Sequence, residues 1–436
     1  MYLSETNSRT KSHLNISNVE PRFGATKLAA GAPHIRAFCE CAGVCAIRCI
    51  LILAVISAAL LIAARPAQAQ TETALYNFCS QPNCSDGAGP QSSLTFDSAG
   101  NLYGTTSGGG AFGAGTVFEL SPNGSGGWNE AVLYSFTGGT DGGWPYYSGV
   151  IFDSAGNLYG TAEIGGANGY GVVFELSPVG TSWTETVLYS FDFSGGAYPL
   201  SGLIMDPAGN LYGTASSNGG AFELSPSGGG WTEQVIYGAE NMQAGLTMDA
   251  AGNIFGINQQ TIFEVSPNGN GGWHSAVIYT FADASKDGSY PVGTLVLDDA
   301  GSLYGTTEYG GKTGSGTVYK LTPVTTGKKK GTWTERILHT FNGKNGSGPR
   351  AGLVFDAAGN IYGTTANGGR YGDGIGFELA AVVGKSSYKP TVLWTFGYDR
   401  GAGPFGSLIL DSAGNLYGTT YAGGDYGAGV VFEVTP

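Results

Sequence analysis

The chain has 436 residues, of which 76 are glycine, and its formal net charge is −13. Residues 71–285 contain 18 acidic residues and no lysine or arginine, whereas residues 286–436 contain 13 basic and 12 acidic residues. A uniformly negative surface repels polyanions, so this balance argues against nucleic acid and acidic polysaccharides as partners there. We therefore expect no nucleic-acid partner.

The first 69 residues have the features of a secretory leader. Residues 50–64 are an apolar run that follows Arg36 and Arg48, and small residues up to Ala69 come after it. Such a run is typical of a signal peptide and is shorter than the roughly 20 residues of a membrane-spanning helix. We expect cleavage near Ala69, secretion to the extracellular space or the periplasm, and no membrane span in the mature protein.

Residues 1–43 are longer than a leader needs, so we expect the signal peptide itself to begin near Val44. Four cysteines fall in the leader, at Cys39, Cys41, Cys45 and Cys49. Because that segment is expected to be removed, we do not predict a metal site there. Cys79 and Cys84 are the only cysteines after the leader, and in an oxidising compartment they predict a local disulfide.

A sevenfold repeat follows the leader. Its most constant phrase is an apolar run ending in Asp, followed by Ala-Gly-Asn-Leu-Tyr-Gly-Thr. The anchoring aspartates are Asp97, Asp153, Asp206, Asp249, Asp298, Asp356 and Asp411. They lie 43 to 58 residues apart, a period typical of propeller blades.

Each repeat contains four short β-prone runs bounded by turn residues. In the copy around Asp153 these runs are residues 132–136, 149–153, 158–161 and 172–176. No stretch of helical periodicity lies between them, so seven repeats predict 28 strands. In the Asp-Ser-Ala-Gly-Asn turn, we expect the aspartate to accept hydrogen bonds from nearby backbone amides and the glycine to supply a positive φ.

The ends of the repeat region indicate how the sheets close into a ring. Residues 73–78 match residues 132–136, whereas the last repeat stops at residues 431–434. If the run that ends in Asp is the innermost strand, residues 73–78 supply the outer strand of the last blade and remove an exposed sheet edge. We therefore predict an all-β fold over residues 71–436: a monomeric seven-bladed β-propeller of four-stranded blades, closed by the N-terminal strand.

The repeated phrase also resembles a known family. Leu-Tyr-Ser-Phe, Asp-Gly, Pro, Gly-Leu-Ile-x-Asp, Gly-Asn-Leu-Tyr-Gly-Thr-Thr and Gly-x-Val-Phe-Glu-Leu recur together over nearly all of residues 71–436. This pattern is similar to the GloVer (gloeo/verruco) tandem repeat of exported bacterial proteins. The resemblance implies an extracellular or envelope protein with no established molecular activity.

Motifs for catalysis, metal binding or cofactor binding are not evident after the leader. His274 and His339 lie in outer-strand segments without neighbouring ligand or triad residues. The glycine-rich loops lack the Gly-Lys-Ser/Thr of a phosphate loop, and the repeated Asp lacks the ligand series of a calcium loop. We predict no catalytic residue, no metal and no cofactor.

The loops on one rim of the ring carry the remaining candidates for function. Aromatic and charged residues gather in them, and aromatic faces with scattered acceptors suit a sugar or peptide ligand. The candidate ligand contacts are Trp144, Tyr146, Tyr309, Arg350, Tyr371 and Tyr421. The same residues could equally form loop cores. Because the loops of the fourth repeat are short, we expect a ligand to lie away from the axis, over the longer loops of the other blades.

Two readings of these residues remain open. The rim arginines Arg350 and Arg370 are expected to pair with Asp373, or alternatively to receive a ligand carboxylate. The protein as a whole is expected to be a non-enzymatic binding or scaffold propeller whose ligand is a carbohydrate or an envelope protein. The alternative is a polysaccharide lyase or glycoside hydrolase that uses rim carboxylates as acid and base.

Overall fold

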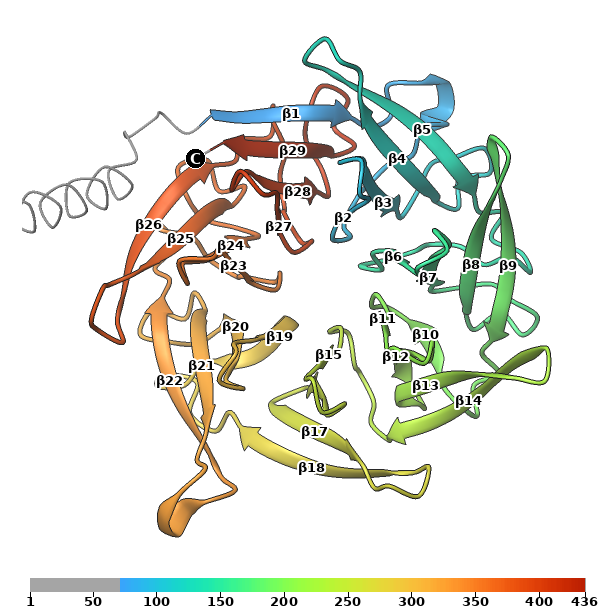
Figure 1. The fold of residues 1–436 in the computed structure, drawn as a ribbon. Coiled ribbons are helices and arrows are strands. Elements are labelled where there is room, and N and C mark those ends of the chain that lie inside the picture. The colour runs from blue at the N-terminus through green and yellow to red at the C-terminus, as the bar shows by residue number, and fades with distance from the viewer. Residues whose placement is uncertain (1–70, 436) are drawn as a thin grey trace, which may run out of the picture. The chain divides into compact units, whose positions relative to one another are not determined.

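The computed structural model describes residues 71–435, and these form a closed ring of seven β-sheets (Figure 1). Each sheet is an antiparallel blade, and in the first six blades the strands follow one another in chain order from the centre of the ring outward. The prediction of an all-β, seven-bladed propeller is therefore confirmed. The predicted leader, with its cleavage point near Ala69 and its four cysteines, lies outside the described residues.

The first three blades occupy the first half of the ring. The first contains β2 (Thr95–Phe96), β3 (Leu102–Thr106), β4 (Thr116–Pro122) and β5 (Trp128–Ser135). The second contains β6 (Ile151–Phe152), β7 (Leu158–Ala162), β8 (Val172–Val179) and β9 (Ser182–Ser190). The third contains β10 (Ala197–Pro199), β11 (Ile204–Met205), β12 (Leu211–Ser217), β13 (Gly220–Ser227) and β14 (Gly230–Tyr237).

The remaining four blades complete the ring. The fourth contains β15 (Thr247–Met248), β16 (Ile254–Asn258), β17 (Thr261–Pro267) and β18 (Trp273–Thr280). The fifth contains β19 (Ser289–Leu297), β20 (Leu303–Tyr309), β21 (Thr317–Pro323) and β22 (Trp333–Thr340). The sixth contains β23 (Val354–Phe355), β24 (Ile361–Thr365), β25 (Ile375–Ala381) and β26 (Tyr388–Thr395). The seventh contains β27 (Ile409–Leu410), β28 (Leu416–Thr420), β29 (Val430–Thr435) and β1 (Thr71–Asn77). Two short 3-10 helices, η1 (Pro82–Cys84) and η2 (Gly327–Lys329), lie in connections.

The ring closes as the sequence predicts. Strand β1 pairs antiparallel with β29, with Thr71 opposite Thr435 and Asn77 opposite Val430. Figure 1 shows the N-terminal strand beside the C-terminal one at the outer edge of the seventh blade. The first and last parts of the propeller sequence therefore share one sheet, and β1 pairs with the edge of β29 that would otherwise be exposed.

The described residues form 29 strands rather than the predicted 28, because the third blade carries one extra strand. β12 extends to Ser217 and turns tightly into β13, so its longer edge accepts a second partner. β10 pairs there, with Ala197 opposite Ser217, while β11 pairs with the inner part of β12. In the fifth blade, a single inner strand, β19, is continuous over nine residues and takes the place that β10 and β11 share in the third blade.

The repeated aspartate forms the turn that the sequence predicts. Oδ1 of Asp153 accepts hydrogen bonds from the backbone amides of Ala155 at 2.8 Å and Asn157 at 2.9 Å. Its Oδ2 accepts from Nδ2 of Asn157 at 2.9 Å and from the hydroxyl of Tyr159 at 3.1 Å. Burial raises the pKa of this carboxyl, but the hydrogen bonds from Asn157, Ala155 and Tyr159 lower it more, so its pKa falls below the ordinary value of 3.8. The carboxylate thus fixes both the hairpin and the tyrosine of Leu-Tyr-Gly-Thr.

The glycine and the threonine of Leu-Tyr-Gly-Thr hold neighbouring strands and neighbouring blades together. A Cβ on Gly160 would lie 2.6 Å from the ring of Phe174, so glycine leaves the space that this buried ring fills. The hydroxyl of Thr161 donates across the blade boundary to the carbonyl oxygen of Ser201 at 2.9 Å. Equivalent bonds to the next blade are made by Thr105, Thr214, Thr306, Thr364 and Thr419. The fourth blade has Ile257 at this position and so lacks the hydroxyl.

Candidate functional site

The antiparallel blades place two sets of connections on the same face of the ring. Connections between the second and third strands lie there, together with those that lead from the outer strand of one blade to the inner strand of the next. We call this side the loop face. The short turns between the first and second strands, and between the third and fourth, lie on the opposite side, the hairpin face. We call the residues just before each inner strand a lead-in segment, such as residues 404–408 before β27.

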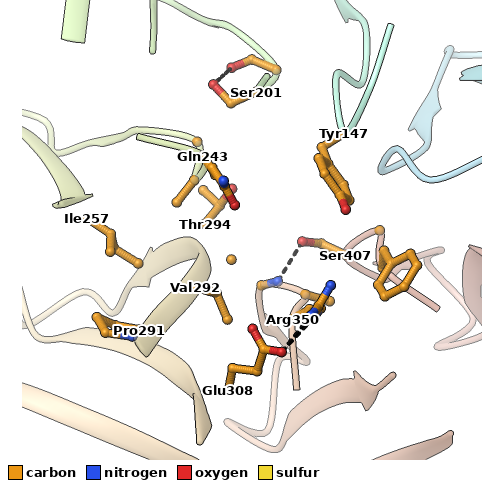
Figure 2. Close-up of a pocket in the computed structure, with 18 of the residues that line it drawn as sticks. Tyr147, Ser201, Gln243, Ile257, Pro291, Val292, Thr294, Glu308, Arg350 and Ser407 are labelled. Carbon is orange, nitrogen blue, oxygen red and sulfur yellow. Dashed lines mark hydrogen bonds and ion pairs between the residues drawn. The ribbon is translucent and has the colours of Figure 1, made fainter. Parts of the chain in front are cut away.

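A pocket of about 510 Å³, the central pocket, lies at the middle of the ring where the lead-in segments meet (Figure 2). All seven blades contribute to its wall. The lining residues are Gln91, Ser93, Tyr147, Ser201, Gly202, Asn241, Gln243, Ala244, Gly245, Ile257, Gln259, Gln260, Tyr290, Pro291, Val292, Gly293, Thr294, Glu308, Arg350, Ala351, Gly352, Phe405, Gly406 and Ser407. This volume falls in the range of small-molecule sites.

Glycines allow the lead-in segments to approach one another closely around this pocket. A Cβ on Gly406 would lie 2.4 Å from the carbonyl oxygen of Ser92, and one on Gly149 would lie 2.8 Å from that of Ser93. Any larger residue at these two positions would push adjacent blades apart. The width of the central pocket therefore depends on glycine at the blade boundaries.

The wall of the central pocket is rich in amides and hydroxyls. Oγ of Ser407 accepts a hydrogen bond from the backbone amide of Gly352 at 2.9 Å, which joins the sixth and seventh blades. Oε1 of Gln260 accepts from the backbone amide of Tyr290 at 3.2 Å, which joins the fourth and fifth. Figure 2 shows Gln243 reaching toward the pocket from the fourth blade. Such groups both donate and accept, so the wall suits a ligand with many hydroxyls.

One ion pair sits in this otherwise neutral wall. Nη2 and Nε of Arg350 lie 2.6 Å and 3.0 Å from Oε1 of Glu308. The side chain of Glu308 is 6% exposed and that of Arg350 is 39% exposed. The guanidinium also lies 5.4 Å from the centre of the Phe405 ring. Burial lowers the pKa of Arg350, but the hydrogen bonds to Glu308 raise it more, so the pKa of the guanidinium lies above its ordinary value.

Several residues that line the pocket have an unusual backbone. Tyr147, Gln259 and Tyr290 have φ values of 45°, 50° and 58°. Bulky residues rarely adopt this left-handed conformation, which costs about 1–3 kcal/mol and is concentrated at functional sites. The central pocket is therefore lined in part by residues whose backbone is strained.

Three of the residues predicted as ligand contacts lie together in a second pocket. Trp144, Tyr146 and Tyr421 line a pocket of about 440 Å³ on the loop face, beside the first and seventh blades. We call this the side pocket. Its other lining residues are Ala88, Gly89, Ser107, Gly108, Ala422, Gly427 and Ala428. It lies in the off-axis sector that the sequence predicted, whereas the larger central pocket lies on the axis.

The other three predicted contacts are distributed differently. Arg350 lines the central pocket. Tyr309 is half exposed, 6.1 Å from Tyr290 between ring centres, and a hydrogen bond to Glu308 is the main cause of its raised pKa. Tyr371 is 60% exposed and lines neither of the two pockets described here.

The expected pairing of the rim arginines with Asp373 is wrong for Arg350. Its partner is Glu308, because the lead-in segment of the sixth blade lies against β20 of the fifth. Arg370 instead places its guanidinium 5.3 Å from the centre of the Tyr371 ring, and the described residues show no ion pair between Arg370 and Asp373.

The prediction of contacts missed Tyr147, Gln243 and Phe405, which line the central pocket. Each lies in a lead-in segment, four residues before an inner strand begins. That position in the repeat was the available signal, because it faces the axis whatever the side chain is. Selection by aromatic and charged character alone favoured the more exposed loop tips.

The exposed aromatic side chains are confined to the loop face. Among the described residues, nine aromatic residues count as exposed, and all lie in the connections that form this face or at the strand ends next to them: Phe112, Trp144, Phe193, Tyr290, Tyr309, Tyr371, Tyr398, Tyr421 and Tyr426. The other exposed large apolar residues are valines on outer strands and hairpin tips: Val179, Val235, Val277, Val383 and Val392. Aromatic residues therefore surround the pockets on one side of the ring only.

The remaining predictions concern metals, membranes and cysteines. Within residues 71–435, there is no cluster of three or more His, Cys, Asp or Glu side chains arranged to hold a metal ion. The same part of the chain has no helix of the length and apolarity that a membrane crossing requires. Cys79 and Cys84 form the predicted disulfide. Beside it, Asp86 accepts a hydrogen bond from the hydroxyl of Tyr76 at 2.8 Å.

Comparisons with known proteins agree with this architecture. The fold resembles virginiamycin B lyase from Staphylococcus aureus, with 13% identity and a TM-score of 0.53 over 84% of this chain and 99% of that one. It also resembles the periplasmic gluconolactonase of Pseudomonas aeruginosa, with 16% identity and a TM-score of 0.47 over 69% of this chain and 84% of that one. At these identities the likeness concerns the fold alone.

Sequence comparison gives the family. No curated protein matches the sequence. The Gloeobacter/Verrucomicrobia repeat, however, matches residues 64–261 and again residues 245–436, which together span the whole propeller. The chain therefore belongs to the Gloeobacter/Verrucomicrobia repeat family.

Proposed function

We propose that this protein is an exported, non-enzymatic propeller that binds neutral carbohydrate on its loop face, with the central pocket as the primary site. The observation that carries the proposal is the confinement of all nine exposed aromatic residues to the face that holds an amide-rich pocket. Aromatic rings offer flat apolar faces to sugar rings, and amides and hydroxyls pair with sugar hydroxyls.

The charge of the site favours a neutral ligand. Arg350 and Glu308 are the charged residues that line the central pocket within the described chain, and they neutralise each other. A ligand carboxylate or phosphate would need to displace Glu308 from Arg350 and leave it buried without a partner. A neutral saccharide requires no such exchange.

The same ion pair is the reason for proposing binding rather than cleavage. Glycoside hydrolysis uses two carboxyl groups on either side of the scissile bond, roughly 5–9.5 Å apart. Among the described residues that line the central pocket, Glu308 is the one carboxylate, and its Oε1 accepts both hydrogen bonds from Arg350. A single carboxylate that is engaged in this way does not supply the pair of carboxyl groups that glycoside hydrolysis requires.

Export is the second part of the proposal. It is supported by the signal-like run at residues 50–64 and by the Cys79–Cys84 disulfide, because disulfides persist mainly in oxidising compartments. We expect the mature protein to act as a monomer outside the cytoplasm, in the envelope or the extracellular space.

A glycan array followed by titration calorimetry tests the proposal. We expect neutral oligosaccharides to bind, and Phe405→Ala or Gln243→Ala to weaken binding about tenfold, or about 1.4 kcal/mol. Val383→Ala is the matched control, because Val383 is 99% exposed on the hairpin face and should not affect binding.

The products should be analysed in the same experiment. Mass spectrometry after prolonged incubation should find the oligosaccharides intact. Shortened or unsaturated products would instead support the lyase or hydrolase alternative. Binding of isolated envelope proteins with no glycan bound would support a protein ligand and contradict the proposal.

A further inference from the structure

The central pocket and the side pocket share a wall of aromatic rings. Tyr146 lines the side pocket and the next residue, Tyr147, lines the central pocket, with ring centres 5.9 Å apart. Tyr147 has a φ of 45°, and the side chains of Tyr146 and Tyr147 line different pockets. The lead-in segment of the second blade therefore forms part of the boundary between them.

The seventh blade supplies the other half of this wall. Phe405 lines the central pocket, and its ring centre lies 6.2 Å from that of Tyr147. Tyr421, from the connection between β28 and β29, lines the side pocket, 6.0 Å from Phe405. The rings thus form a continuous series, Tyr146–Tyr147–Phe405–Tyr421, whose two middle members line the central pocket and whose two ends line the side pocket.

The side pocket has the same chemical character as the central one. The described residues that line it carry no charge, and Trp144 and Tyr421 are 45% and 44% exposed. Trp144 has φ of 54°, a conformation rarely adopted by a bulky residue. Gly89 is needed beneath the aromatic wall, since a Cβ there would lie 3.2 Å from the Tyr421 ring. The pocket therefore offers aromatic surface and backbone polar groups to a neutral ligand.

We propose that the two pockets are subsites of one elongated site for a neutral oligosaccharide, whose chain continues from the central pocket over the Tyr147–Phe405 rings into the side pocket. The inference rests on the proposed carbohydrate-binding function and adds the extended form of the ligand. An unbroken series of rings at spacings of 5.9 to 6.2 Å gives a chain of sugars successive surfaces to lie on. Two pockets that bind separate ligands would not require a continuous series of aromatic rings between them.

Calorimetry with cello-, malto-, laminari- and chito-oligosaccharides tests the inference, each series running from disaccharide to hexasaccharide. In the native protein, the hexasaccharide of the recognised series should bind about tenfold more tightly than the disaccharide, with one oligosaccharide per chain. Tyr421→Ala and Trp144→Ala should remove this gain with length and weaken hexasaccharide binding more than disaccharide binding. Phe405→Ala should weaken every length.

Tyr426→Ala is the matched control, because Tyr426 lies in the same β28–β29 connection, is 57% exposed and lines neither pocket. It should bind every length as the native protein does. Equal affinity for short and long oligosaccharides, or two disaccharides bound per chain without a gain in length, would overturn the inference and leave the proposed function standing. Binding of none of the four series at any length would overturn both.

Discussion

Arg350, in the lead-in segment of the sixth blade, donates from both Nε and Nη2 to Oε1 of Glu308, in β20 of the fifth blade. The contact joins two blades at the wall of the central pocket. It also explains how a carboxylate that is 6% exposed is kept in a site otherwise lined by neutral groups.

Arg350→Met should lower the free energy of unfolding by about 1–3 kcal/mol, because Glu308 would remain buried without its charged partner. The double variant Arg350→Met/Glu308→Gln should recover part of the loss, as measured by urea denaturation. Lys286→Met is the control, since its ion pair with Asp283 is exposed to solvent and is expected to contribute little to stability. Equal losses in the single and double variants would show that the pair is not coupled.

Deleting residues 71–79 should greatly reduce thermal stability, because it removes β1 from the seventh blade and exposes the edge of β29. It also removes Phe78, which is fully buried. Removing residues 326–331 is the control, since that hairpin tip is exposed, carries η2 and lies outside β21 and β22. The control deletion should melt at the native temperature in a calorimetric scan. If the deletion of residues 71–79 does so as well, the closure of the ring does not stabilise the protein.

The fold was predictable because its determinants repeat and act over short distances. Asp153 and its hydrogen-bond partners lie within six residues of each other, so the turn could be inferred from one copy and checked against six others. The match of residues 73–78 to an outer strand likewise predicted that the N-terminal strand closes the ring. The hydrogen bond from the hydroxyl of Thr161 was not predicted, because its partner Ser201 is 40 residues away in the next blade.

The site was predictable only in part because its residues do not repeat. Trp144, Tyr146 and Tyr421 could be chosen for their aromatic character, and they do lie together. Tyr147 and Phe405 share one position in the repeat, four residues before an inner strand, and that position rather than their aromatic character indicates the axis. The partner of Arg350 likewise depends on the contact between two blades.

Thr161→Val should lower the free energy of unfolding by about 1 kcal/mol, because it removes the hydrogen bonds of the hydroxyl to Ser201 and to Ser148 without changing the shape of the side chain. Thr184→Val, at an exposed position on β9, is the matched control and should have little effect. Chemical denaturation measures both. A loss at Thr184 as large as that at Thr161 would contradict a specific role for the bond between blades.

Stability should decrease as the pH rises from about 4.5 to about 7. The cause is a set of glutamates on the outer strands: Glu72, Glu130, Glu185, Glu233 and Glu335. Burial raises the pKa of each from 4.5 to about 7, and within the described structure Oε1 of each has no hydrogen-bond partner. The folded state therefore binds more protons than the unfolded state in this range, and the stability that these groups contribute at low pH is lost as they ionise.

Melting temperatures at about pH 5 and about pH 8 measure this effect, and the lower pH should give the higher value. Turn aspartates such as Asp153 have lowered pKa values, so their contribution is lost only below about 3.8, outside this window. Glu130→Gln/Glu185→Gln should narrow the difference, whereas Glu240→Gln, at an exposed position, should not. A melting temperature that rises from pH 5 to pH 8 would show that these glutamates do not control the pH dependence.

Reducing the Cys79–Cys84 disulfide should lower the free energy of unfolding by about 2 kcal/mol or less, because the bond closes only a short loop. Denaturation of the native protein with and without reductant measures the change, and Cys79→Ser/Cys84→Ser should match the reduced protein. Free thiols in secreted material, detected by mass spectrometry, would contradict the bond itself.

The most direct test of the account is a crystal structure of the protein with a bound neutral oligosaccharide. We expect an intact sugar chain on the loop face, with one ring in the central pocket against Phe405 and Tyr147 and hydrogen bonds to Gln243. The ion pair between Arg350 and Glu308 should persist beside it. An oligosaccharide bound to the hairpin face, or one cleaved within the pocket, would contradict the account.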